Sequence, residues 1–185
     1  MRRWFLILAP VALLTAAYSD YVQAKQKLER ITQAKTAPGA MVSLSSKELN
    51  AFVAEEVKRA VPEGIRQPEV QLGSGVATGV ALIDFAKMRT AQGNPPGWFM
   101  SQLLSGEHPV SVTARIRSAD GKAQVDVQRV EISGLPVEGR VLDWLIANYL
   151  RPRYPSAKIG EPFELGYRMD RLEVQPGTVK VHIAR

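Results

Sequence analysis

Residues 109–133, PVSVTARIRSADGKAQVDVQRVEIS, carry the strongest strand pattern of the chain. Apolar residues alternate with polar ones from Val110 to Ile116, which is the period of a strand with one buried and one solvated face. Asp120-Gly121 is typical of a tight hairpin, because both turn positions favour positive φ. In the returning segment the apolar positions change from odd to even numbering, which predicts a β-bulge at 128–129.

Two amphipathic helices flank this hairpin in the sequence. Ser45 to Glu48 has the pattern of a capping box, and the residues that follow are apolar at helical spacing as far as Val61. A second helix is predicted from Val137 to Leu150, ended by the proline that follows. Five apolar residues within 98–104 predict a short apolar helix, which is either a plug on the sheet, a lid over a cavity or a wedge that dips into a bilayer.

Further strands are predicted at 65–72 and 76–85, and a last hairpin at 163–183 with a type II turn at 175–178. Hairpin connections favour an antiparallel sheet, and several shifts of phase favour strong twist. The predicted fold class is therefore α+β: a curled antiparallel sheet of about six strands packed on two amphipathic helices. A hydrophobic signal or anchor helix precedes it.

The first 35 residues resemble an export leader. Arg2 and Arg3 precede an uncharged stretch, Trp4–Ala17, and small residues allow cleavage after Ala17 or Ala24. Without cleavage, the same stretch is an anchor followed by a solvated helical stalk, and the remainder faces outward because the arginines stay cytoplasmic. Both alternatives remain open. Residues 36–40 are predicted as a linker and 41–185 as a single domain, periplasmic or anchored on the outer face of the cytoplasmic membrane.

Composition excludes several kinds of protein. The 185 residues include no cysteine, so disulfides, thiolate metal sites and a lipid-modified N-terminal cysteine are excluded. The net charge of +6 is modest, and nucleic acid is not an expected partner outside the cytosol. The two histidines, His108 and His182, are far apart, and no motif of a nucleophile or of a dinucleotide site is complete. We therefore expect no enzyme, no metal and no cofactor, with an envelope hydrolase as a remote alternative.

The order of caps, turns and hairpins along the chain resembles that of a known superfamily. Its features are the serine-rich cap before 48–52, the Asp120-Gly121 hairpin, the segment 132–137 that leads into a helix, and the closing hairpin that ends at Val181. Together they resemble the small exported bacterial proteins of the tubular lipid-binding superfamily, half-tubes related to bactericidal/permeability-increasing protein. The resemblance implies a curled sheet around long helices and an apolar groove for acyl chains. It carries over no catalytic residue and no individual ligand contact.

We therefore expect a non-enzymatic envelope protein that binds a lipid or lipid-linked molecule in an apolar trough between helices and sheet. Helical periodicity and the aromatic loop give the predicted lining: Phe52, Val53, Val57, Leu142, Leu145, Ile146 and Tyr149, with Trp98 and Phe99 at the mouth. The membrane is a second expected partner if the leader is retained. The alternative is a structural or scaffolding module of the envelope, with a fully packed core, that recruits a protein partner.

Overall fold

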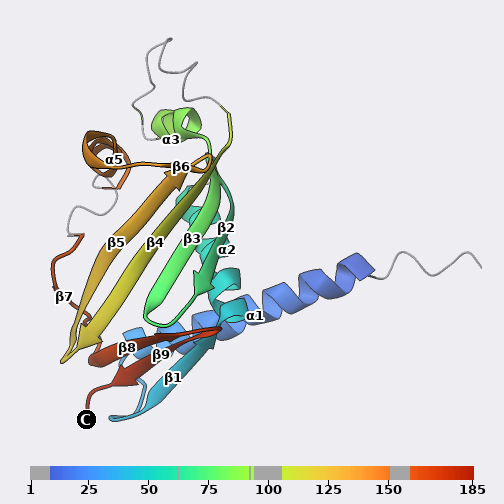
Figure 1. The fold of residues 1–185 in the computed structure, drawn as a ribbon. Coiled ribbons are helices and arrows are strands. Elements are labelled where there is room, and N and C mark those ends of the chain that lie inside the picture. The colour runs from blue at the N-terminus through green and yellow to red at the C-terminus, as the bar shows by residue number, and fades with distance from the viewer. Residues whose placement is uncertain (1–8, 62, 92, 94–105, 151–158) are drawn as a thin grey trace, which may run out of the picture.

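A computed structural model describes the chain except for residues 1–8, 62, 92, 94–105 and 151–158 (Figure 1). Its helices are α1 (Ala9–Thr32), α2 (Ser46–Ala60), α3 (Phe85–Ala91) and α5 (Gly139–Leu145), and α5 continues into a π-helical turn, η1 (Ile146–Leu150). Its strands are β1 (Met41–Ser45), β2 (Ile65–Leu72), β3 (Val76–Ile83), β4 (His108–Ala119), β5 (Lys122–Ile132), β6 (Leu135–Pro136), β7 (Phe163–Glu164), β8 (Met169–Gln175) and β9 (Thr178–Ile183).

The larger sheet contains the hairpin that dominates the sequence pattern. Its strand order is β2-β3-β4-β5-β6, β7 also pairs with β5, and every pairing is antiparallel. Asp120 and Gly121 turn between β4 and β5 with φ of 51° and 75°, as that turn requires. Thr113 pairs with Arg129 and Ala114 with Val127, so the predicted bulge is confirmed.

A second, three-stranded sheet has the order β1-β9-β8. The predicted turn at 175–178 joins β8 to β9, with Gly177 at φ 80°. Strand β1 pairs with β9 and was not predicted, because five residues with three apolar positions are too short a pattern. The two sheets meet where Gly75 N donates to Val174 O at 2.9 Å and Ser118 Oγ donates to Leu172 O at 2.7 Å.

The α+β class is therefore confirmed, whereas the prediction of one curled sheet is wrong: the described strands form two sheets, and neither is curled. The reason lies in the segment predicted as the first strand of the last hairpin. Gly166, Tyr167 and Arg168 all have positive φ, of 69°, 48° and 59°, and no strand passes through such a run. The residues before the run pair with β5 as β7, and those after it pair with β9 as β8.

The capping box of α2 is confirmed, since Ser45 Oγ accepts from Glu48 N and Glu48 Oε2 accepts from Ser45 N. Helix α5 begins at Gly139 and not at Val137, because 135–136 pairs with β5 as β6. The strand predicted at 76–85 ends at Ile83, and helix α3, which was not predicted, begins at Phe85. There the buried carboxylate of Asp84 accepts from Lys87 N at 3.0 Å, which satisfies an otherwise free amide at the helix start.

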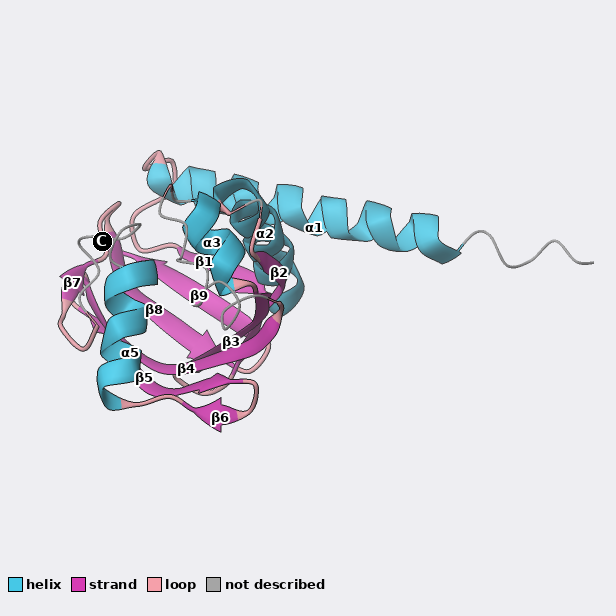
Figure 2. Cartoon of the chain, turned by 90° about the horizontal axis from the view of Figure 1, so that it is seen from above, coloured by secondary structure: helices cyan, strands magenta, loops and turns pink. Residues whose placement is uncertain are grey.

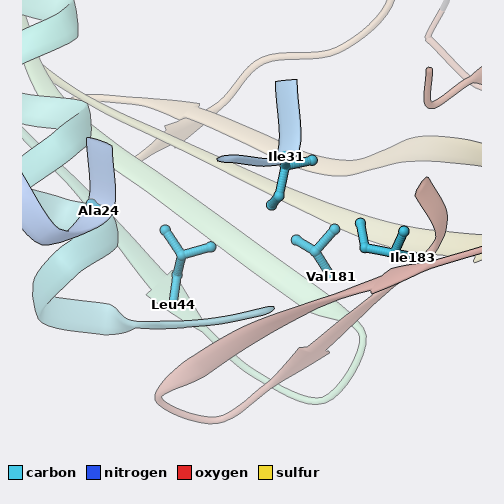
Figure 3. Packing of buried hydrophobic residues seen from close by; sticks show 5 residues of the cluster. All are labelled: Ala24, Ile31, Leu44, Val181 and Ile183. Carbon is cyan, nitrogen blue, oxygen red and sulfur yellow. The ribbon is translucent and has the colours of Figure 1, made fainter. Parts of the chain in front are cut away.

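Helix α1 is packed on the domain, so the predicted solvated stalk has a buried face. Ala24 is 0% exposed and Ile31 3% exposed, and both lie against residues of the three-stranded sheet (Figure 3). We call this cluster the lower core; its buried members are Ala24, Ile31, Leu44, Val181 and Ile183. Lys27 Nζ donates to Glu48 Oε1 at 2.6 Å and to Ser43 O at 2.8 Å, joining α1 to the start of α2.

Among the described residues, no helix is both long enough and apolar enough to cross a membrane. Helix α3 and helix α5 lie at one end of the larger sheet, and the three-stranded sheet, which carries the lower core, lies at the other (Figure 1). A second buried cluster, the upper core, lies at the α3 end and consists of Val61, Phe85 and Met88. The candidate site lies between α2, α3 and α5 over the sheet.

Candidate functional site

An apolar cavity of about 550 Å³ lies against one face of the larger sheet. Its walls come from α2, α3 and α5, and its floor comes from β3, β4 and β5. Viewed from above, α5 lies toward the β5 side of the larger sheet, and α2 and α3 lie toward its β2 side (Figure 2). The lining residues are Glu56, Val57, Ala60, Val61, Ile65, Ile83, Phe85, Met88, Val110, Val112, Val127, Val130, Ile132, Leu142, Leu145, Ile146 and Ile159.

The floor follows from the alternation in β4 and β5. Directly paired residues of antiparallel strands point to the same face, so Val110 with Ile132, and Val112 with Val130, form two apolar cross-strand pairs. The bulge in β5 shifts the phase by one residue and thereby keeps Val127 on this same face, opposite Ala114. Without the bulge, one half of β5 would turn its valines to solvent.

The central strand β3 is unusual because none of its residues is buried. All eight are half-exposed, although β3 lies between β2 and β4. Its residues opposite Val110, Val112 and Ala114 are Ala81, Gly79 and Ala77. These small residues lie on the same face of the sheet as the cavity and border its lining, to which β3 itself contributes Ile83. A packed domain would normally bury one face of a central strand.

The cavity wall is almost free of charge. Among the described lining residues, Glu56 is the single charged one, and its carboxylate accepts from Arg59 at 2.9 Å on the exposed side of α2. The described residues hold no group of three histidine, aspartate or glutamate side chains that is able to bind a metal ion. The wall offers apolar surface rather than an arrangement for acid–base or metal chemistry.

Four of the predicted lining residues come together in this cavity: Val57, Leu142, Leu145 and Ile146. Helix α5 presents the two leucines, and Ile146 is the first residue of η1. Val57 faces them from α2. Val57 lies far from the other three in the sequence, and helical periodicity nonetheless predicted that all four face the sheet.

The other predicted residues fall elsewhere. Phe52 packs beside the lower core and stacks on Tyr21 with ring centroids 6.3 Å apart, since it lies about 140° around α2 from Val57. Val53 is half-buried and is not among the lining residues. Tyr149 belongs to η1 but its side chain is outside the described part, and Trp98 and Phe99 lie in 94–105, outside the described residues.

Sequence reasoning assigned the lining to the helices and missed the strands that form its floor. The available signal was the alternation of apolar residues in the predicted hairpin, which includes Val112, Val127 and Ile132. Phe85 and Met88 were missed for a different reason, because α3 is only seven residues long and follows a strand directly. Too short a helix shows no clear period.

No model of a known protein family matches this chain, and a search of curated proteins finds no significant match.

Proposed function

We propose that this chain is an exported envelope protein without catalytic activity, anchored in the membrane if its leader is retained, which binds the acyl chains of a lipid or lipid-linked molecule in the apolar cavity. The observation that carries the proposal is the cavity itself, about 550 Å³ in volume and lined by apolar side chains apart from Glu56. This volume is within the range of about 300–1,000 Å³ that is common for ligand pockets.

The chemistry of the wall favours hydrocarbon over a polar ligand. A polar ligand needs partners for its donors and acceptors, and leaving them unpaired costs roughly 1–3 kcal/mol each. A hydrocarbon chain needs none and gains about 0.8 kcal/mol for each methylene group removed from water. A head group would remain outside the cavity. The resemblance to the tubular lipid-binding superfamily points to the same class of ligand.

The packing of helix α1 argues against cleavage after Ala24. Cleavage after Ala24 would remove Tyr21, which is 7% exposed and stacks on Phe52, and would leave a charged amino terminus beside the lower core. The domain is therefore more stable with residues 18–24 attached. Cleavage after Ala17 would leave this packing intact, and if the leader is retained, the uncharged stretch Trp4–Ala17 holds the protein at the outer face of the cytoplasmic membrane.

The scaffolding alternative requires a core that its own side chains fill. The half-exposed central strand β3 and the unfilled cavity favour the lipid-binding function instead. An exposed strand edge or loop that recruits a protein partner is compatible with either function, so this feature does not discriminate between them.

Photocrosslinking in cells tests the proposal without detergent. Cells that express the full chain are fed a fatty acid with a photoreactive diazirine on its chain, and are then irradiated. We expect crosslinked peptides from β4, β5 and α5, which line the cavity. Crosslinks confined to the first 17 residues would mean that the protein meets lipid through its leader alone, and the proposal would be wrong.

A pair of variants on α5 localises the lipid. Leu145→Trp fills the cavity, whereas Val141→Trp adds the same side chain at a position that is 58% exposed on the same helix. We expect Leu145→Trp to reduce crosslinking to β4 and β5 at least about tenfold, which corresponds to about 1.4 kcal/mol. Val141→Trp should crosslink as the parent does. Equal crosslinking in both variants would place the lipid elsewhere.

A further inference from the structure

Gly79 lies in the middle of β3, where the backbone conformation does not require a glycine. Its φ lies outside the left-handed region, and it pairs regularly with Val70 on one side and Val112 on the other. A glycine at such a position costs about 0.5–1 kcal/mol relative to alanine. A glycine inside a regular strand is common where a ligand or another backbone comes close.

No part of the described protein uses the space at Gly79. A Cβ atom built on this residue meets no heavy atom within 4 Å. Gly64, by contrast, is crowded, because a Cβ atom there would lie 2.6 Å from Met88 Cγ and 2.9 Å from Met88 N. Close packing against a neighbouring element therefore explains Gly64 but not Gly79.

The open space at Gly79 lies on the same face of the sheet as the cavity and next to its lining. Val112 lies directly across from Gly79 and lines the cavity, and paired residues share one face of the sheet. The neighbours of Gly79 on that face, Ala77 and Ala81, are small as well. At the α3 end, by contrast, Ile83, Phe85 and Met88 crowd the same wall.

From this gradient of side-chain size we infer that Gly79 sets the length of the hydrocarbon chain that the cavity accepts. The chain lies along β3 from the crowded α3 end toward the lower core, and its terminal carbons occupy the space over Gly79. The inference rests on the proposed lipid-binding function and adds a specificity-determining residue to it. A larger side chain at this position shortens the accepted chain and leaves the rest of the wall unchanged.

The test compares Gly79→Leu with the parent chain and with a control, Val80→Leu. Val80 is the next residue of β3 and points to the opposite face, where it pairs with Ser111. The full chains are purified from the same bacterial host, and the acyl chains that remain bound are identified by mass spectrometry. We expect the distribution for Gly79→Leu to shift shorter by about two to four methylene groups, the space that a leucine side chain fills. The control should match the parent.

The outcomes separate the two proposals. A parent chain that carries no lipid overturns the lipid-binding function and this inference with it. A parent that carries lipid, together with an unchanged chain-length distribution in folded Gly79→Leu, overturns the role of Gly79 alone. If Gly79→Leu does not fold, Gly79→Ala takes its place, and a shift of less than about one methylene group then counts against the inference.

Discussion

The two ends of the molecule bury their apolar residues in different ways. At the lower core, the buried members, among them Ala24, Leu44 and Val181, are at most 5% exposed. At the upper core, three buried residues are surrounded by half-exposed ones, and the cavity opens beside them. No large side chain among the described residues is fully buried. The chain therefore closes one end on itself and leaves the other end incompletely filled.

The difference comes from the covering element. Helix α1 presents Ala24 to the three-stranded sheet, and a small residue lets the helix approach closely. Lys27 then reaches Glu48, whose other oxygen accepts from Ser45 N, so the charge on α1 is paired at the start of α2. No comparable described helix crosses the space between α2 and α5. Under the proposed function, the lower core supplies stability and the upper end supplies the binding site.

The largest effect is expected from shortening α1. Removal of residues 1–24 takes away Tyr21 and Ala24, and loss of a buried aromatic side chain alone costs about 3–5 kcal/mol. This is a large part of the 5–15 kcal/mol that is typical of a domain, so we expect the shortened chain to be largely unfolded by circular dichroism. Removal of residues 1–17 is the control and should preserve the fold. Equal stability of both truncated chains would show that α1 is dispensable.

The second prediction compares the two cores directly. Ile31→Ala in the lower core should lower the free energy of unfolding by about 2–4 kcal/mol, because it leaves a void in a closed cluster. Leu145→Ala at the cavity should cost less, about 1–2 kcal/mol, since this side chain is half-exposed and already faces open space. Thermal unfolding of the full chains in one mild detergent measures both. A larger loss of stability for Leu145→Ala than for Ile31→Ala would contradict this difference between the two cores.

The third prediction concerns the loss of stability at low pH. Burial acts to raise the pKa of Glu48, but hydrogen bonds from Lys27 and Ser45 outweigh it, so the pKa lies below the ordinary 4.5. The stability from this carboxylate is therefore present above about pH 4.5 and is lost as the pH falls through the lowered pKa. Glu48→Gln should cost about 1–2 kcal/mol at pH 7, and its difference from the parent should narrow below pH 4.5. A difference that stays constant from pH 7 to 3 would assign the effect to packing.

The smallest expected effect has the opposite sign. Gly79→Ala should stabilise the chain by about 0.4–1 kcal/mol, because the added methyl group meets no heavy atom within 4 Å and the unfolded chain loses freedom. The same change at Gly64 should destabilise, since φ is 100° there and Met88 is in the way. Thermal unfolding checks the pair. A destabilised Gly79→Ala would show that the space on β3 is not free.

Much of the local structure could be predicted from the sequence. The hairpin at Asp120-Gly121, its bulge, the capping box at Ser45 and the turn before Thr178 each depend on a few adjacent residues and their preferred φ and ψ. Helical periodicity also identified Val57, Leu142, Leu145 and Ile146 as residues that face the sheet. These features are local, so their signals lie within one stretch of chain.

The α+β class, the antiparallel pairing and the inward faces of the helices and strands could thus be predicted from local patterns. The packing of α1 on the three-stranded sheet and the division of the strands into two sheets could not. The position of the cavity at the α3 end could not be predicted either. The physical reason is that these outcomes depend on contacts between residues distant in the chain, such as Lys27 with Glu48 and Leu44 with Val181. The period of a single segment does not show which partner covers its apolar face.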